Sequence, residues 1–187
     1  MAPLHIRRAG QGDASLVARI HLAAWRATYA RLVPDEAAAG ACAERSARWR
    51  ASFADPESAD AVFLAARRGE EPAGFSACGP VDNPKLARAG FRGEIYAVYL
   101  LPGLQRQGAG RLLMQAASRH LVSRGILDAG VWVLRDNAGA RGFYEALGAR
   151  ETGIEGVWPV LDMKLPDLAY GWRDLSALSD RAQSRDR

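Results

Sequence analysis

The chain has 187 residues, with 49% hydrophobic residues, 25% charged residues and a formal net charge of +4. This length and composition are typical of one globular domain, and they exclude a disordered chain, a collagen and a small disulfide scaffold. The apolar runs are too short for a membrane span, and the N-terminal sequence lacks the apolar core of a signal peptide.

The first fifty residues predict one strand and two helices. Leu4–Arg8 is predicted to form a short strand. Asp13 is predicted to be the N-cap of a helix that ends near Tyr29, because apolar residues recur there at helical spacing. A second helix is predicted to begin at Pro34, which is followed by two acidic residues, and to run toward Arg50.

The middle of the chain is rich in predicted strands. Two apolar runs, 61–66 and 73–78, flank a loop that contains glycine and predict an antiparallel hairpin. Residues 79–93 are predicted to be a loop. Residues 94–101 carry aromatic and β-branched side chains and predict a strand that ends at the following proline.

Two further helices and a strand follow. A helix is predicted from about Gly108 to Gly125, with an apolar stripe along one face. Residues 131–134 predict a strand. Asn137 is predicted to cap a helix that ends at Gly148.

The last predicted strands are 150–154 and 157–165, and the chain becomes polar after Pro166. We therefore expect one folded domain over residues 1–166 and a weakly ordered polar tail over 167–187. The order of elements predicts an α/β (α+β) fold, with a mixed sheet and helices on its faces.

The turn after the strand at 94–101 is the most informative segment for function. Gln105, Gly108 and Gly110 stand just before a predicted helix, where backbone N–H groups are unpaired and the helix dipole is positive. Arg106 and Arg111 add charge, so the segment predicts a phosphate or pyrophosphate site. The alternative is a glycine-rich turn that needs only positive φ or close packing.

Three motifs in register resemble the GNAT superfamily of N-acetyltransferases. Gln105–Gly110 is similar to its (Gln/Arg)-x-x-Gly-x-(Gly/Ala) motif, 94–102 resembles its central strand, and 137–148 resembles its Asn-x-x-Ala-x-x-Phe-Tyr-x-x-x-Gly helix. The resemblance covers roughly residues 4–165. It implies a mixed, largely antiparallel seven-stranded sheet with helices on both faces and a splayed central strand.

The resemblance implies that acetyl-CoA is the cosubstrate and that no metal is needed. The pyrophosphate would lie on backbone amides, the pantetheine arm on the edge of the central strand, and Asn137 and Phe143 against that arm. Asn137 also reads as a plain helix cap. The predicted cofactor-binding residues are Tyr99, Leu100, Gln105, Arg106, Gln107, Gly108, Ala109, Gly110, Arg111, Asn137 and Phe143.

Two residues are predicted to be catalytic. The resemblance makes Glu94 the general base that accepts a proton from the acceptor amine, and Tyr144 the acid that protonates the departing thiolate. The alternatives are a surface carboxylate at the end of a strand for Glu94 and a core aromatic residue for Tyr144. Trp25 and Tyr29, one helical turn apart, either line the acceptor pocket or pack in the core.

The basic residues suggest a competing hypothesis. Arginine accounts for 23 of the 25 basic residues, and only Lys85 and Lys164 are lysines. An Arg-rich basic protein can bind nucleic acid, but these arginines are scattered rather than clustered, which favours codon usage in a GC-rich bacterial genome. We therefore expect no nucleic-acid partner and no membrane partner.

The resemblance implies transfer of an acetyl group to a primary amine, on a small molecule or a protein, by direct attack in a ternary complex. The alternative is a non-catalytic CoA-binding sensor on the same fold. Cys42 and Cys78 match no metal spacing, so we expect reduced thiols and a cytoplasmic location. Many relatives in the resembled family are homodimers, so the resemblance makes a homodimer one expected state of this chain, although its sequence identifies no interface.

Overall fold

A computed structural model describes residues 2–29, 58–160 and 163–180, together with single positions and short runs between 40 and 55. The described elements are β1 (Leu4–Arg8), η1 (Gln11–Asp13), α1 (Ala14–Tyr29), β2 (Ala61–Arg67), β3 (Gly74–Pro80), α3 (Pro84–Arg88), β4 (Gly93–Leu100), η2 (Pro102–Leu104), α4 (Ala109–Ser123), β5 (Ala129–Leu134), α5 (Ala138–Ala146), β6 (Arg150–Val160), β7 (Met163–Trp172) and α6 (Ser176–Ser179).

The strands form one seven-stranded sheet in the order β1-β2-β3-β4-β5-β7-β6. The β1–β2, β5–β7 and β6–β7 pairs are antiparallel, whereas β4 and β5 are parallel. The parallel ladder joins Gly93–Ile95 to Ala129–Val131, which is three of the eight residues of β4. The predicted mixed α/β sheet is confirmed.

The chain folds into two compact units that share β3 and β4. Unit 1 comprises Met1–Ala77 and Ala97–Ala117, and unit 2 comprises Cys78–Tyr96 and Ser118–Arg187. Each unit has its own apolar cluster, around Leu113 in unit 1 and around Leu86 in unit 2. No described helix is long and apolar enough to cross a lipid bilayer.

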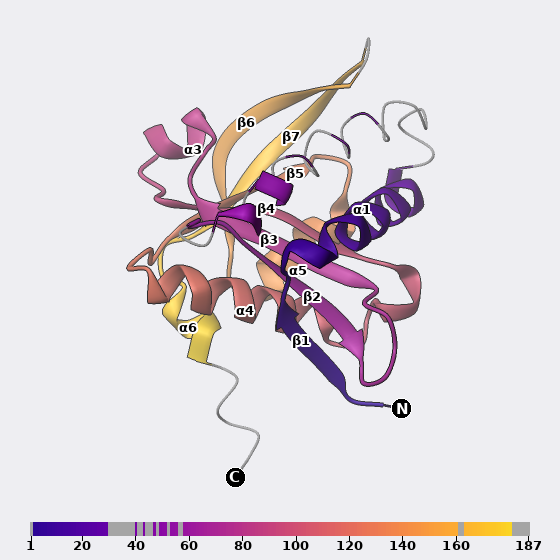
Figure 1. Cartoon of the computed structure of the whole chain (residues 1–187). Coiled ribbons are helices and arrows are strands. Elements are labelled where there is room, and N and C mark those ends of the chain that lie inside the picture. Colours follow the sequence, from indigo (N-terminus) through magenta and orange to yellow (C-terminus); the bar gives the residue numbers. More distant parts are fainter. Residues whose placement is uncertain are drawn as a thin grey trace. The chain divides into compact units, whose positions relative to one another are not determined.

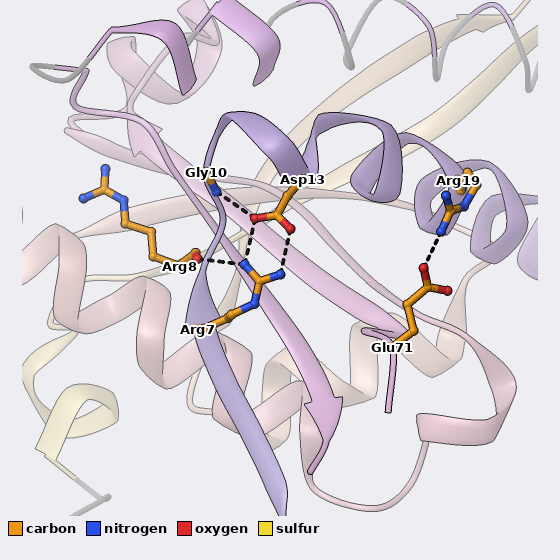
Figure 2. Close-up of polar contacts among 6 residues, drawn as sticks. All are labelled: Arg7, Arg8, Gly10, Asp13, Arg19 and Glu71. Carbon is orange, nitrogen blue, oxygen red and sulfur yellow. Dashed lines mark hydrogen bonds and ion pairs between the residues drawn. The ribbon is translucent and has the colours of Figure 1, made fainter. Parts of the chain in front are cut away.

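The start of α1 differs from the prediction. Asp13 is the last residue of a short 3-10 turn rather than the N-cap of the α-helix, and its carboxylate accepts a hydrogen bond from the backbone N–H of Gly10 at 2.9 Å. Figure 2 shows that the same carboxylate receives both terminal nitrogens of Arg7, each at 2.7 Å. Asp13 is thus the third residue after Gly10, the N-cap of this turn, and its carboxylate joins the turn to β1.

A short helix interrupts the segment 79–93, which the sequence predicted to be entirely loop. Asn83 caps α3 by accepting a hydrogen bond from the N–H of Lys85, and Pro84 occupies the first helical position. Asn followed by Pro is a favourable helix start, because proline lacks the N–H that would be unpaired there. Leu86 of α3 is fully buried in unit 2.

The strands at the C-terminal end are longer than predicted. β6 runs from Arg150 through Val160 with an irregular register between Glu151 and Glu155, and β7 continues through Pro166 to Trp172. Figure 1 shows the two strands as a long ribbon. The prediction of a tail from residue 167 is therefore wrong for 167–180, which contain the last six of the ten residues of β7, and α6. Residues 181–187 lie outside the described residues.

The remaining predicted elements are confirmed within a few residues: the first strand, the pair at β2 and β3, the central strand, and the helices α4 and α5. Gly125 and Gly148 have φ of 74° and 92°, which suits them to end the two helices. The predicted helix start at Pro34 and the thiol of Cys42 lie outside the described residues. Cys78 is a buried free thiol.

Candidate functional site

The predicted site residues fall into two groups, one in each unit. Unit 1 holds the end of β4 and the turn before α4, and unit 2 holds the start of β4 and α5. In unit 1 the turn has an unusual backbone: Arg106 has φ of 60°, and it is the only described non-glycine residue with positive φ. Gly108 also has positive φ, 89°. Left-handed residues within such a turn direct successive N–H groups toward one side, which forms an anion-binding concavity.

The N–H groups of this turn have no acceptor inside the described chain. On the N-terminal side of this turn, the N–H of Gln105 donates to the carbonyl of Pro102. On its C-terminal side, the N–H of Leu112 donates to the carbonyl of Gly108. Between them, none of the N–H groups of 106–111 donates to a described residue. An unpaired helix start with positive dipole favours an anion, so this turn fits the diphosphate of a nucleotide-type cofactor.

Two glutamine side chains brace the turn rather than projecting freely. Gln105 Nε2 donates to the carbonyl of Leu100 at 2.9 Å, and Gln107 Nε2 donates to the carbonyl of Gly103 at 2.8 Å. The first bond ties the turn to the end of β4. Arg106 and Arg111 are exposed, so their guanidinium groups can reach an anion at the turn without a large desolvation cost.

Tyr99 and Leu100, at the end of β4, pack against unit 1. The ring of Tyr99 lies 4.7 Å from that of His21 and 5.7 Å from that of Phe75, measured between centroids. Leu100 packs over Gly74, where an added Cβ would collide with the leucine side chain. The sequence assigned no role to His21, which lies buried within this aromatic cluster. The side chains of Tyr99 and Leu100 thus hold the end of β4 within unit 1.

In unit 2, Glu94 is buried, with 8% of its surface exposed. Its Oε2 accepts hydrogen bonds from the backbone N–H groups of Asp82, at 3.0 Å, and Asn83, at 2.9 Å. These two bonds hold the chain entering α3 against the start of β4. The alternative of an exposed surface carboxylate at the end of a strand is therefore wrong, because Glu94 is buried and held in a fixed orientation.

Asn137, Phe143 and Tyr144 lie on or beside α5. The Oδ1 of Asn137 accepts a hydrogen bond from the N–H of Ala140 at 3.0 Å, which confirms the cap. Tyr144 is 6% exposed, and its ring meets Phe143 at 5.3 Å and the edge of Trp172 at 5.9 Å. Trp172 is in turn fixed by a bond from its Nε1 to the Leu147 carbonyl.

The aromatic pair on α1 is part of the core. Trp25 and Tyr29 are 2% and 8% exposed, and their rings meet edge to face at 5.0 Å. The core interpretation of these two residues is the one that their burial favours. Among the residues that the structure describes, no three His, Cys, Asp or Glu side chains are grouped in a way that would hold a metal ion.

A sequence model of the acetyltransferase (GNAT) family matches residues 20–149, which is more than half of the chain and includes both groups of site residues. This chain belongs to the GNAT family. It is therefore an acyl-CoA-dependent acetyltransferase by family, and the resemblance drawn from its motifs is confirmed.

Individual GNAT relatives agree with the family match. A Bacillus subtilis protein named as the uncharacterized N-acetyltransferase YuaI is 32% identical over 92% of this chain and 95% of its own length. A mycothiol acetyltransferase of Streptomyces scabiei is 34% identical over 67% of this chain, which spans only 38% of that relative. The PaiA N-acetyltransferase of Thermoplasma acidophilum, solved with coenzyme A, has a TM-score of 0.73 at 18% identity, covering 90% of this chain and 98% of the other. That likeness establishes the GNAT fold.

Proposed function

We propose that this GNAT protein transfers an acetyl group from acetyl-CoA to a primary amine, by direct attack of the amine while both substrates are bound. The observation that carries the proposal is the row of N–H groups at 106–111 that find no acceptor in the described chain. Such a row is well suited to a pyrophosphate. When bound, acetyl-CoA supplies a thioester-activated acetyl group, and the products are an amide and free CoA.

The chain would hold the cofactor through the groups that the sequence predicted. The backbone of Arg106–Arg111, with Gly108, Ala109 and Gly110 offering little obstruction, would bind the pyrophosphate. The guanidinium groups of Arg106 and Arg111 would add charge-assisted bonds. The backbone of Tyr99 and Leu100 would pair with the pantetheine arm, and an N–H near Leu100 would stabilise the developing oxyanion.

We propose two further cofactor contacts in unit 2. Asn137 uses one acceptor oxygen in its cap, so its amide is oriented by the start of α5. Phe143 is half-buried and would pack against the apolar part of the arm. Gln105 and Gln107 act indirectly, because their amides brace the turn that presents the N–H groups.

We propose that Glu94 is the general base. A lysine-type amine has a pKa of about 10.4, so only about one molecule in a few thousand is neutral and nucleophilic at pH 7. Once the neutral amine attacks, its nitrogen must lose a proton to become the amide nitrogen, and a carboxylate beside it can accept that proton. The two N–H groups on Oε2 fix the orientation of Glu94, which a positioned base requires.

We propose that Tyr144 protonates the departing thiolate. Its ring is held between Phe143 and Trp172, so the hydroxyl has a defined position. A thiol with a pKa of about 8.5 is already a fair leaving group, so the expected contribution is modest. Tyr144→Phe is expected to lower kcat about tenfold with little change in CoA affinity.

The deciding experiment measures thiol release from acetyl-CoA with a panel of primary amines, alongside CoA affinity by calorimetry. Turnover with at least one amine supports the proposal, and failure to bind CoA overturns it. CoA binding without turnover for any amine, unchanged by Glu94→Gln, would instead establish the non-catalytic CoA-binding module. A cytoplasmic location and a homodimer remain predictions from the sequence.

A further inference from the structure

Unit 2 contains a small pocket whose lining includes none of the proposed cofactor-binding or catalytic residues, although Asn83, one of its lining residues, donates its N–H to Glu94. It has a volume of about 270 Å³ and lies between α3 and the strands β5, β6 and β7. Lys85 and Arg88 of α3 line it on one side, and Trp132 of β5 and Asp167 of β7 line the other. A cavity of this size is slightly below the usual range for drug-sized ligands, so it suits a compact molecule.

Gly156 keeps the sheet side of the pocket open. It is paired directly with Asp167 across the β6–β7 ladder. A Cβ at residue 156 would collide with Asp167 Oδ1 and would lie 2.8 Å from Cζ3 of Trp132. Only glycine therefore allows the carboxylate and the indole to occupy their present places side by side.

Two polar atoms of the pocket residues lack a partner. Asp167 Oδ1 and Trp132 Nε1 are both buried and form no hydrogen bond with any described residue. A buried polar group without a partner destabilises the fold, and such groups are rare in native proteins. Burial raises the pKa of Asp167, while the nearby ammonium of Lys85 acts in the opposite direction. Both atoms are closed to solvent, so it is the remaining surface of the part-buried Asp167 side chain that lines the pocket.

The charged groups of the pocket have both signs. Lys85 Nζ donates to the carbonyl of Glu155 at 2.7 Å, which holds this ammonium at the pocket. Arg88 is exposed and makes no ion pair with a described residue. The lining therefore carries two cations and one carboxylate, so a simple amine meets net positive charge and a simple acid meets Asp167.

We propose that this pocket binds a compact zwitterion, with an amino group and a carboxylate on a short carbon chain. The amino group donates to Asp167, and the carboxylate lies at Lys85 and Arg88. A zwitterion pairs with the carboxylate and with the two cations of the pocket at once, whereas a simple amine or a simple acid pairs with only one sign of charge. The inference stands apart from acetyl transfer, because it concerns binding at residues outside the proposed cofactor and catalytic groups.

The test is calorimetric titration of the whole protein, without acetyl-CoA, with glycine, β-alanine and 4-aminobutyrate. Propylamine and propionate serve as single-charge analogues. At least one zwitterion is expected to bind tenfold more tightly than either analogue. Equal affinity of the analogues, or no binding of any zwitterion at millimolar concentration, would overturn the proposal.

Variants then locate the binding site. Asp167→Asn, which keeps the size of the side chain, and Arg88→Gln, at an exposed position, are each expected to weaken the best zwitterion at least tenfold. Asp180→Asn removes an exposed carboxylate of the same unit outside the pocket and is expected to leave the affinity unchanged. Unaltered affinity in both pocket variants would contradict the assignment. These titrations measure binding without acetyl-CoA, so a failure of the proposed acetyl transfer would neither support nor contradict the zwitterion site.

Discussion

The turn before α4 and the loop before α3 both present backbone N–H groups at the start of a helix, yet they satisfy them differently. At α3, the chain supplies the acceptors: Glu94 takes two N–H groups and Asn83 takes a third. At α4, the backbone N–H groups of residues 106–111 have no acceptor among the described residues. A helix start that the chain completes itself serves stability, whereas one that the chain leaves open is available to an external anion.

The largest expected effect separates the two roles of Glu94. Glu94→Gln keeps an oxygen that can accept both N–H groups but cannot take a proton, so we expect kcat to fall about 100-fold at neutral pH with the fold intact. The rate should recover as the pH approaches the pKa of the acceptor amine. Steady-state kinetics against pH would measure this.

Glu94→Ala is the companion variant, because it removes the acceptor as well as the base. Two N–H groups lose their partner, and we expect the free energy of unfolding to drop by about 2 kcal/mol in urea titrations. If Glu94→Gln retained the wild-type kcat while Glu94→Ala was destabilised, Glu94 would be a loop anchor alone.

The next effect concerns the turn before α4, called the open turn below because the N–H groups of residues 106–111 have no described acceptor. Asp and Asn both tolerate positive φ, so Gly108→Asp and Gly108→Asn differ mainly by one charge. An aspartate would repel the pyrophosphate, and we expect the Kd for CoA to rise about 30-fold, or about 2 kcal/mol, against less than threefold for Gly108→Asn. Equal affinities in calorimetry would mean that the turn does not bind an anion.

The turn at residues 10–13 gives a third case, in which the chain again supplies the acceptor. The Arg7 guanidinium lowers the pKa of Asp13, so this pair stabilises the fold above the unfolded-state pKa of about 3.9 and the contribution is lost as the pH falls through the lower folded-state pKa. We expect Asp13→Asn to lower the free energy of unfolding by about 1 kcal/mol at pH 7, a value limited by solvent screening.

Measurement of Asp13→Asn at pH 7 and pH 3 would check the sign, since the difference from the wild type should shrink at the lower pH. Glu71→Gln is the control. Its ion pair with Arg19 joins side chains that are 62% and 69% exposed, so its loss should be too small to resolve. Figure 2 shows both pairs.

The smallest effect tests the backbone of the open turn. Arg106→Gly relieves the cost of positive φ on a non-glycine residue, so stability should be unchanged or slightly higher. CoA affinity should fall about threefold through loss of one charge. Arg68→Gln removes the same charge from an exposed position in the β2–β3 connection and should leave CoA affinity unchanged.

Local patterns predicted most of the elements, because capping, glycine and alternation signals are short-range. The motif around Gln105 predicted an N–H-rich turn, and the structure describes one. The positive φ of Arg106 could not be predicted, since arginine has no preference for that conformation. Nor could the partners of Glu94 be predicted, because 82–83 and Glu94 meet only once β4 is formed.

The C-terminal strands are the region in which local sequence patterns gave the wrong prediction. The sequence predicts that the fold ends at Pro166, but β7 accommodates this proline and continues to Trp172. A proline is compatible with a strand wherever its missing N–H is not needed, and sequence alone does not give that register. The same error placed Asp167 in a tail and concealed its position beside Gly156 and Trp132.

β7 lies between β5 and β6, although it follows both of them in the sequence. During synthesis, β5 and β6 therefore emerge from the ribosome before the strand that joins them exists. Until β7 is available, β5 and β6 each lack the strand that they pair with in this sheet, and unpaired strand edges favour aggregation. Premature termination near residue 162 would thus leave an aggregation-prone product, not a smaller enzyme.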